Sequence, residues 1–115
     1  MKRKAHLGLV MGLSVAASIG MSGEALAVDA AAAQALAKQS NCFKCHAIDK
    51  KKDAPAWNTV AAKYKGKPDA EAKLIKHITT SPKVKFEDGH EEEHPVIKSK
   101  DESAIKNLVD WILSL

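Results

Sequence analysis

The stretch Cys42-Phe43-Lys44-Cys45-His46 decides how this sequence is interpreted, because it holds both cysteines of the 115-residue chain. Cys-x-x-Cys-His is the attachment signature of c-type haem. Two thiols three positions apart on a helical turn can each add to a haem vinyl group, and the next residue is then close enough to place a ring nitrogen on the iron. The motif therefore predicts one covalently bound haem c, anchored by Cys42 and Cys45, with His46 as an iron ligand.

Three other interpretations of the cysteine pair compete with haem attachment. A disulfide across two residues closes too small a loop to add much stability, and a thioredoxin-type pair expects a βαβ surround that this sequence lacks. A structural zinc site that joins the cysteines to His90 and His94 is the strongest of the three, because these histidines have zinc-finger spacing. Their long separation from Cys45 far exceeds the usual gap of about 12–15 residues, so haem attachment is favoured.

Residues 1–27 have the three-part pattern of a secretory signal peptide. Basic residues at positions 2–4 precede a mostly apolar stretch from Leu7 to Met21, and Ala25-Leu26-Ala27 is a small-x-small cleavage site. The apolar stretch is shorter than the roughly 20 residues of a membrane span, although an uncleaved anchor is an alternative. We therefore expect residues 1–27 to be cleaved and residues 28–115 to form an exported domain without a membrane span.

The composition of residues 28–115 excludes some functions. The whole chain has a net charge of +4, and part of that charge belongs to the predicted signal peptide. What remains is weakly basic and shows no basic helix face with interleaved aromatic residues, which argues against nucleic-acid binding. A domain this short buries a limited core, and small exported domains often compensate with a cofactor, a metal or disulfides.

The residues after the signal peptide are predicted to be helical. Helices are expected over residues 30–38, with Asp29 as N-cap, over 57–64 and over 69–79. A last helix is expected behind a capping box in which Ser99 caps the backbone N–H of Glu102, and its apolar stripe is Ile105, Leu108, Val109, Ile112 and Leu113. No strand alternation of useful length appears, and residues 80–98 are expected to form a long loop of a kind that is usually functional or mobile.

The wider sequence resembles the small bacterial class I cytochromes c, which are single-haem electron carriers of the periplasm. The resemblance covers nearly all of the mature chain and rests on Cys42–Asp49, Ala54-Pro55-Ala56-Trp57, Val60–Tyr64 and Leu108–Leu113. It implies an all-α class I cytochrome c fold, with about four helices around one covalently bound haem and with the first and last helices crossing near a haem edge. It also implies a periplasmic location and one-electron transfer rather than an enzymatic reaction.

The resemblance implies two further haem neighbours. In the family, the carbonyl oxygen of a proline in a Gly-Pro loop accepts a hydrogen bond from the histidine of the motif, so Pro55 would orient His46. Ala54 stands here in place of the family glycine. Trp57 would lie beside the haem, where its N–H could reach a propionate, because a buried indole needs a hydrogen-bond partner.

The sixth iron ligand is where this sequence departs from the family. The family supplies a methionine, usually followed by proline, before the last helix, but all three methionines of this chain lie in the predicted signal peptide. His94-Pro95 stands at the corresponding place, so we expect His94 to be the ligand, with His90 as the alternative. His77 is expected to be a surface residue of its helix, and a lysine or no sixth ligand remains open.

These observations predict a monomeric electron carrier of low potential, with two histidines on the iron, that exchanges electrons with redox partner proteins. A haem protein with an open or labile sixth site that binds or converts O₂, NO, CO or peroxide is the alternative, and a structural zinc module is the third. Two haem propionates would offset the small positive charge, so long-range electrostatic steering of a partner is expected to be weak.

Overall fold

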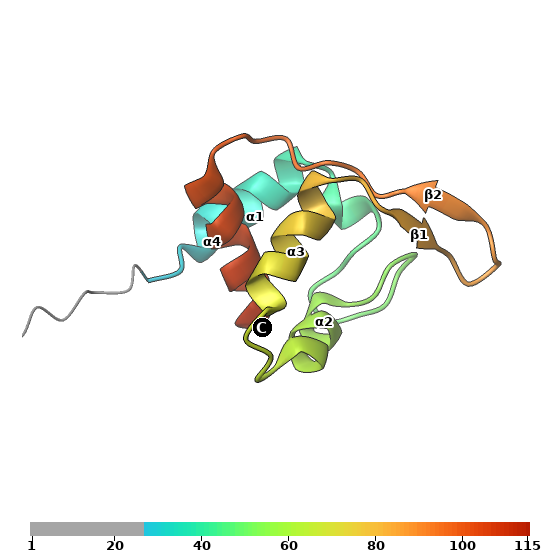
Figure 1. Cartoon of the computed structure of the whole chain (residues 1–115), viewed down its shortest axis with the longest axis horizontal. Helices are drawn as coiled ribbons and strands as arrows, with labels where there is room; N and C mark the ends of the chain where they lie inside the picture. The colour runs from blue at the N-terminus through green and yellow to red at the C-terminus, as the bar shows by residue number, and fades with distance from the viewer. Residues whose placement is uncertain (1–26) are drawn as a thin grey trace, which may run out of the picture.

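The computed structural model describes residues 27–115, and Figure 1 shows their arrangement. The predicted signal peptide lies, except for Ala27, outside the described residues. In chain order the elements are α1 (Ala30–Gln39), the short 3-10 helix η1 (Cys42–Lys44), α2 (Trp57–Tyr64), α3 (Ala70–Thr79), β1 (Lys83–Lys85), β2 (Glu91–Glu93) and α4 (Glu102–Leu113). Among these residues, no helix has the length and apolar character needed to cross a membrane.

Helices α1 and α4 pack against each other and bring the two ends of the described chain together (Figure 1). The apolar stripe of α4 is buried, with Leu108 and Val109 almost without exposed surface, and small residues of α1 such as Ala33 permit a close approach. At the start of α1, the backbone N–H of Asp29 donates to Asn107 Oδ1, and Asn107 Nδ2 donates back to the Asp29 carbonyl oxygen, each at 2.9 Å. This reciprocal pair fixes α1 on α4.

Helices α2 and α3 also pack against α4, so that α4 contacts all three other helices. Trp57 at the start of α2 and Trp111 of α4 meet edge to face, with ring centres 5.6 Å apart, a favourable geometry for aromatic pairs. The prediction of a mostly helical cytochrome c fold with four helices is therefore confirmed.

Residues 80–98 contain a β-hairpin, so the prediction of a loop without regular structure is wrong. Strands β1 and β2 are antiparallel, and Lys83 lies opposite Glu93 while Lys85 lies opposite Glu91. Opposite charges at facing positions stabilise such a pair. The turn contains Gly89, whose φ of 91° favours glycine, and the hairpin extends away from the helices (Figure 1).

The N-cap of α4 also differs from the expectation. The helix begins at Glu102, and the Asp101 carboxylate accepts from the backbone N–H groups of Ser103 and Ala104 at 3.0 and 3.4 Å. Ser99 instead accepts from the Asp101 N–H at 3.1 Å. Aspartate is at least as good an N-cap as serine, and Asp101 stands closer to the apolar stripe. The other predicted cap is confirmed, since Asp29 accepts from Ala32 N–H at 2.9 Å.

Candidate haem site

A cavity of about 540 Å³ lies between α2, α3, α4 and the base of the hairpin. This volume is within the range of small-molecule and cofactor pockets. Most of its surface is apolar, and its apolar side chains include Leu74, Ile78, Leu108 and Ile112. The sequence-predicted residues that line it are Cys42, Cys45, His46, Pro55, Trp57 and His94. An apolar cavity that gathers two thiols and two imidazoles suits a covalently bound haem.

The two cysteines reach the cavity because the chain reverses sharply after α1. Asn41 has a positive φ of 59°, which asparagine tolerates better than most residues, and η1 follows as a single tight turn. Within that turn the backbone N–H of His46 donates to the Cys42 carbonyl oxygen at 2.9 Å. Both thiols are free and half-buried, and burial raises the pKa of Cys42 above its ordinary value. The turn thus presents both sulfur atoms and the His46 ring to the same cavity.

The His46 ring is oriented by a backbone carbonyl. Its Nδ1 lies 2.8 Å from the Pro55 carbonyl oxygen and donates to it, which places the proton on Nδ1 and leaves the Nε2 lone pair for a metal. Burial lowers the pKa of His46, while the hydrogen bond to Pro55 opposes this effect. The ring is therefore neutral near pH 7, which is the form that binds iron.

Trp57 forms the wall of the cavity beside His46. Its side chain is buried, and its ring stacks on His46 with ring centres 5.3 Å apart and an interplanar angle of 26°. Phe43 packs on the same indole at 5.2 Å. The backbone N–H of Trp57 donates to the Ala47 carbonyl oxygen at 2.9 Å, so the residue that begins α2 is tied to the chain just after the haem motif.

The His94 ring approaches His46 from the base of the hairpin. The ring centres lie 6.3 Å apart, and His94 Nδ1 donates to the Pro95 carbonyl oxygen at 2.8 Å. Two metal–imidazole bonds of about 2 Å, with each ring centre about 1 Å beyond its nitrogen, separate two ring centres by about 6 Å. The observed spacing therefore fits one metal ion between the two rings.

His77 lines the cavity, so the expectation of a surface residue is wrong. Its half-buried ring packs edge to face against His94 with ring centres 4.5 Å apart. Burial lowers the pKa of His77, and nearby His94 and His46 lower it further. Helical spacing was a usable signal, because His77 follows the cavity-lining Leu74 by three positions and shares its face of α3.

His90 stands at the turn of the hairpin and does not line the cavity. Its ring stacks on Phe86 with centres 4.3 Å apart, and its Nδ1 contacts the Asp88 carboxylate. That hydrogen bond is the main reason why the pKa of His90 lies above its ordinary value. Of the two histidines considered for the sixth position, the structure brings His94 to the cavity and leaves His90 at the surface.

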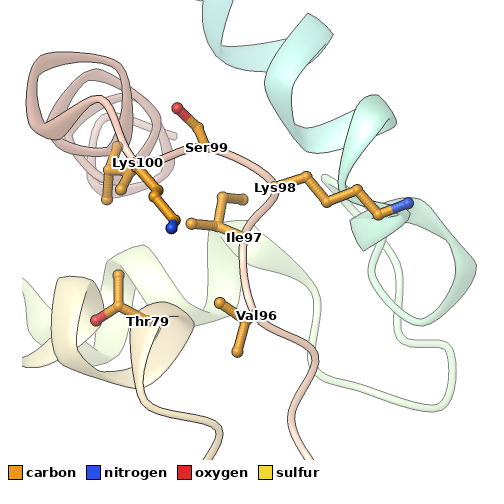
Figure 2. A pocket seen from close by; sticks show the side chains of 7 residues that line it. Thr79, Val96, Ile97, Lys98, Ser99 and Lys100 are labelled. Atoms are coloured by element: carbon orange, nitrogen blue, oxygen red, sulfur yellow. The ribbon is translucent and has the colours of Figure 1, made fainter.

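A second cavity, of about 550 Å³, lies behind the first and shares Val96 and Ile97 with it. Figure 2 shows its lining, to which the end of α3 and the segment before α4 contribute Thr79, Val96, Ile97, Lys98, Ser99, Lys100 and Ile105. None of the thiols or histidines of the candidate site reaches it. The haem chemistry is therefore confined to the first cavity.

A helical frame that closes a Cys-x-x-Cys-His turn over such a cavity defines a c-type cytochrome, and the comparisons agree. The family model described as Cytochrome c matches residues 30–115, and the chain belongs to that family. It is a carrier of electrons that binds haem c covalently through Cys42 and Cys45. The family therefore assigns the cysteine pair to haem and sets the zinc interpretation aside.

Several relatives lie within this family. Cytochrome c-551 of Pseudomonas aeruginosa is 37% identical over 81 residues, which cover 70% of this chain and 74% of that protein. Cytochrome c-552 of Nitrosomonas europaea is 38% identical over 80 residues, covering 70% and 75%. Among solved structures, the class 1 cytochrome MtoD from Sideroxydans lithotrophicus ES-1 is 63% identical, with a TM-score of 0.74, and the match covers 76% of this chain and 97% of that one.

Proposed function

We propose that this cytochrome carries single electrons in the periplasm with His46 and His94 as the two axial ligands of its haem, at a lower potential than its methionine-ligated relatives. The observation that carries the proposal is the pair of imidazole rings in one cavity, with ring centres 6.3 Å apart. Residues 28–115 contain no methionine that could take the sixth position.

The two rings have the same hydrogen-bonding arrangement, which supports equivalent roles. Each Nδ1–H donates to a proline carbonyl oxygen at 2.8 Å, that of Pro55 for His46 and that of Pro95 for His94. A metal-binding histidine usually donates its second ring N–H in this way, which fixes the tautomer and raises the basicity of the ligating nitrogen. Both Nε2 atoms are therefore available to the iron.

The bound haem supplies a one-electron couple, and the chain sets the conditions under which it operates. Cys42 and Cys45 retain the group, the two histidines orient it, and Trp57 with the apolar side chains of the cavity keeps water away. An axial methionine raises the potential of a haem. A histidine in its place lowers the potential, which favours exchange with redox partner proteins of low potential.

Export is the second part of the proposal. Cleavage after Ala27 leaves Asp29 and its two contacts intact, namely the cap on α1 and the reciprocal hydrogen bonds with Asn107. The mature N-terminus would then begin two residues before the first helix. The mass of the secreted holoprotein tests this: residues 28–115 plus one haem are expected, and a chain that retains residues 1–27 contradicts cleavage.

The ligation is tested by the ferric spectrum of the holoprotein together with the His94→Met variant. We expect a six-coordinate low-spin spectrum in the wild type and a higher potential in His94→Met, because methionine restores the ligand found in the family. His90→Met is the matched control, since His90 lies outside the cavity and its replacement is expected to leave the potential unchanged. A high-spin wild-type spectrum would favour the open sixth site instead.

A further inference from the structure

Ser81, between α3 and β1, has a backbone conformation that serine rarely adopts. Its φ is 49°, and among the described residues the other non-glycine residue with a positive φ is Asn41, which immediately precedes Cys42. Positive φ is costly for a residue with a Cβ atom, and it persists where the surrounding structure imposes it. Both such residues thus stand on the segments that deliver candidate haem-binding side chains, which raises the question of what Ser81 holds in place.

The Ser81 side chain is bonded to the backbone of His94. Its hydroxyl donates to the His94 carbonyl oxygen at 2.8 Å, and the His94 N–H donates to the carbonyl oxygen of the next residue, Pro82, at 2.9 Å. Both polar groups of the His94 backbone are therefore held by two consecutive residues. Ser81 and His94 are both half-buried, so a carbonyl that lost this partner would not be fully hydrated in exchange.

These contacts belong to a clamp that begins at the end of α3. On the other side of His94, the N–H of the buried Ile97 donates to the carbonyl oxygen of Ile78 at 2.9 Å. The segment that carries His94 is thus fixed to α3 and the residues after it at both ends. Within this clamp the Ser81 hydroxyl is the link made by a side chain, and a substitution can remove it without changing the others.

We propose that Ser81 is a positioning residue for the sixth iron ligand, which holds the His94 backbone so that the ring stays on the iron. This inference rests on the proposed function, in which His94 is that ligand. The positive φ of Ser81 directs the hydroxyl across the base of the hairpin to the His94 carbonyl. Without it, His94 leaves the iron more often, and an external ligand enters the vacated position more quickly.

The experiment measures the rate at which CO binds to the ferrous holoprotein, since CO requires that the sixth ligand dissociate. We expect Ser81→Ala to raise this rate about fivefold, which corresponds to about 1 kcal/mol, the usual net contribution of one hydrogen bond. Ser81→Gly also lacks the hydroxyl but accepts the positive φ without strain, so it folds readily and should show the same rise.

Thr80→Ala is the matched control. Its hydroxyl donates to the Lys76 carbonyl oxygen at 2.7 Å, at the end of α3, and does not contact His94. We expect its CO-binding rate to equal that of the wild type. A rise in both Ser81 variants and not in Thr80→Ala supports the inference.

Three results would overturn it. Wild-type rates in both Ser81 variants would show that the hydroxyl does not hold the ligand, while the ligation by His94 would stand if His94→Ala still opened the site. An equal rise in Thr80→Ala would assign the effect to general loosening of the end of α3. If His94→Ala left the iron six-coordinate, the proposed ligation would fail, and the inference would fail with it.

Discussion

The rings of His46 and His94 lie 6.3 Å apart between centres, and each is held by a hydrogen bond from Nδ1 to a proline carbonyl oxygen. One ring belongs to the haem-attachment turn and the other to the base of the hairpin. Two segments far apart in the sequence thus deliver the same donor atom to one cavity. This symmetry supports a haem with two histidine ligands within a family whose members are cytochromes c.

Trp57→Phe should change the potential as well as the stability. Trp57 stacks on His46 and lines the cavity, so its replacement removes an N–H donor next to the haem and leaves space in a packed region. Full truncation of such a residue costs about 3–5 kcal/mol, and Phe should cost a smaller part of this. Denaturant unfolding and a redox titration measure the two effects.

Trp111→Phe is the control for that variant. Trp111 is buried and packs edge to face on Trp57, but it does not line the cavity. We expect it to lower the free energy of unfolding and to leave the potential unchanged. If Trp57→Phe left both quantities at their wild-type values, a role for Trp57 at the haem would be wrong.

Asp101→Ala should destabilise the protein by about 1 kcal/mol, the typical cost of losing an N-cap. Its carboxylate accepts from two N–H groups of the first turn of α4, and α4 contacts each of the other helices. Ser99→Ala should cost less, because Ser99 accepts from a single N–H before the helix. Thermal unfolding of the two holoproteins compares them, and a larger loss in Ser99→Ala would restore the capping box as the start of the helix.

His90 should make the hairpin more stable in acid than in base. Because the Asp88 carboxylate raises the pKa of His90 in the folded protein, the folded state binds the proton more tightly than the unfolded state. This contribution is fully present below the unfolded pKa of about 6.5, and it is lost as the pH rises through the folded value. The difference in unfolding free energy between the wild type and His90→Gln should therefore shrink from pH 5 to pH 9. A difference that is constant over this range would contradict the assigned interaction.

Much of the fold could be predicted because its elements depend on local sequence. The apolar stripe of α4, the alanines of α1 and the cap at Asp29 each identify a helix within a few residues. The Cys-x-x-Cys-His turn likewise contains its own chemistry, since the backbone bond from His46 to Cys42 closes within five residues. These features require no knowledge of what packs against them.

The features that could not be predicted depend on contacts between distant segments. The hairpin strands have three residues each, too few for an alternating pattern, and their pairing relies on charges such as Lys83 and Glu93 that look like ordinary surface residues. His77 lies in the cavity because of the way α3 packs on α4. Asp101 and Ser99 are both good caps, and the helix start selects between them through tertiary packing.

The most direct test of two-histidine ligation is the binding of CO to the ferrous holoprotein in a pair of histidine variants. His94→Ala should open the sixth position, so that CO binds at once and the ferric spectrum becomes high-spin. His90→Ala should bind CO as slowly as the wild type, because that ring lies at the hairpin turn outside the cavity. If instead His90→Ala opened the site while His94→Ala remained six-coordinate and low-spin, the assignment of His94 as the sixth ligand would be wrong.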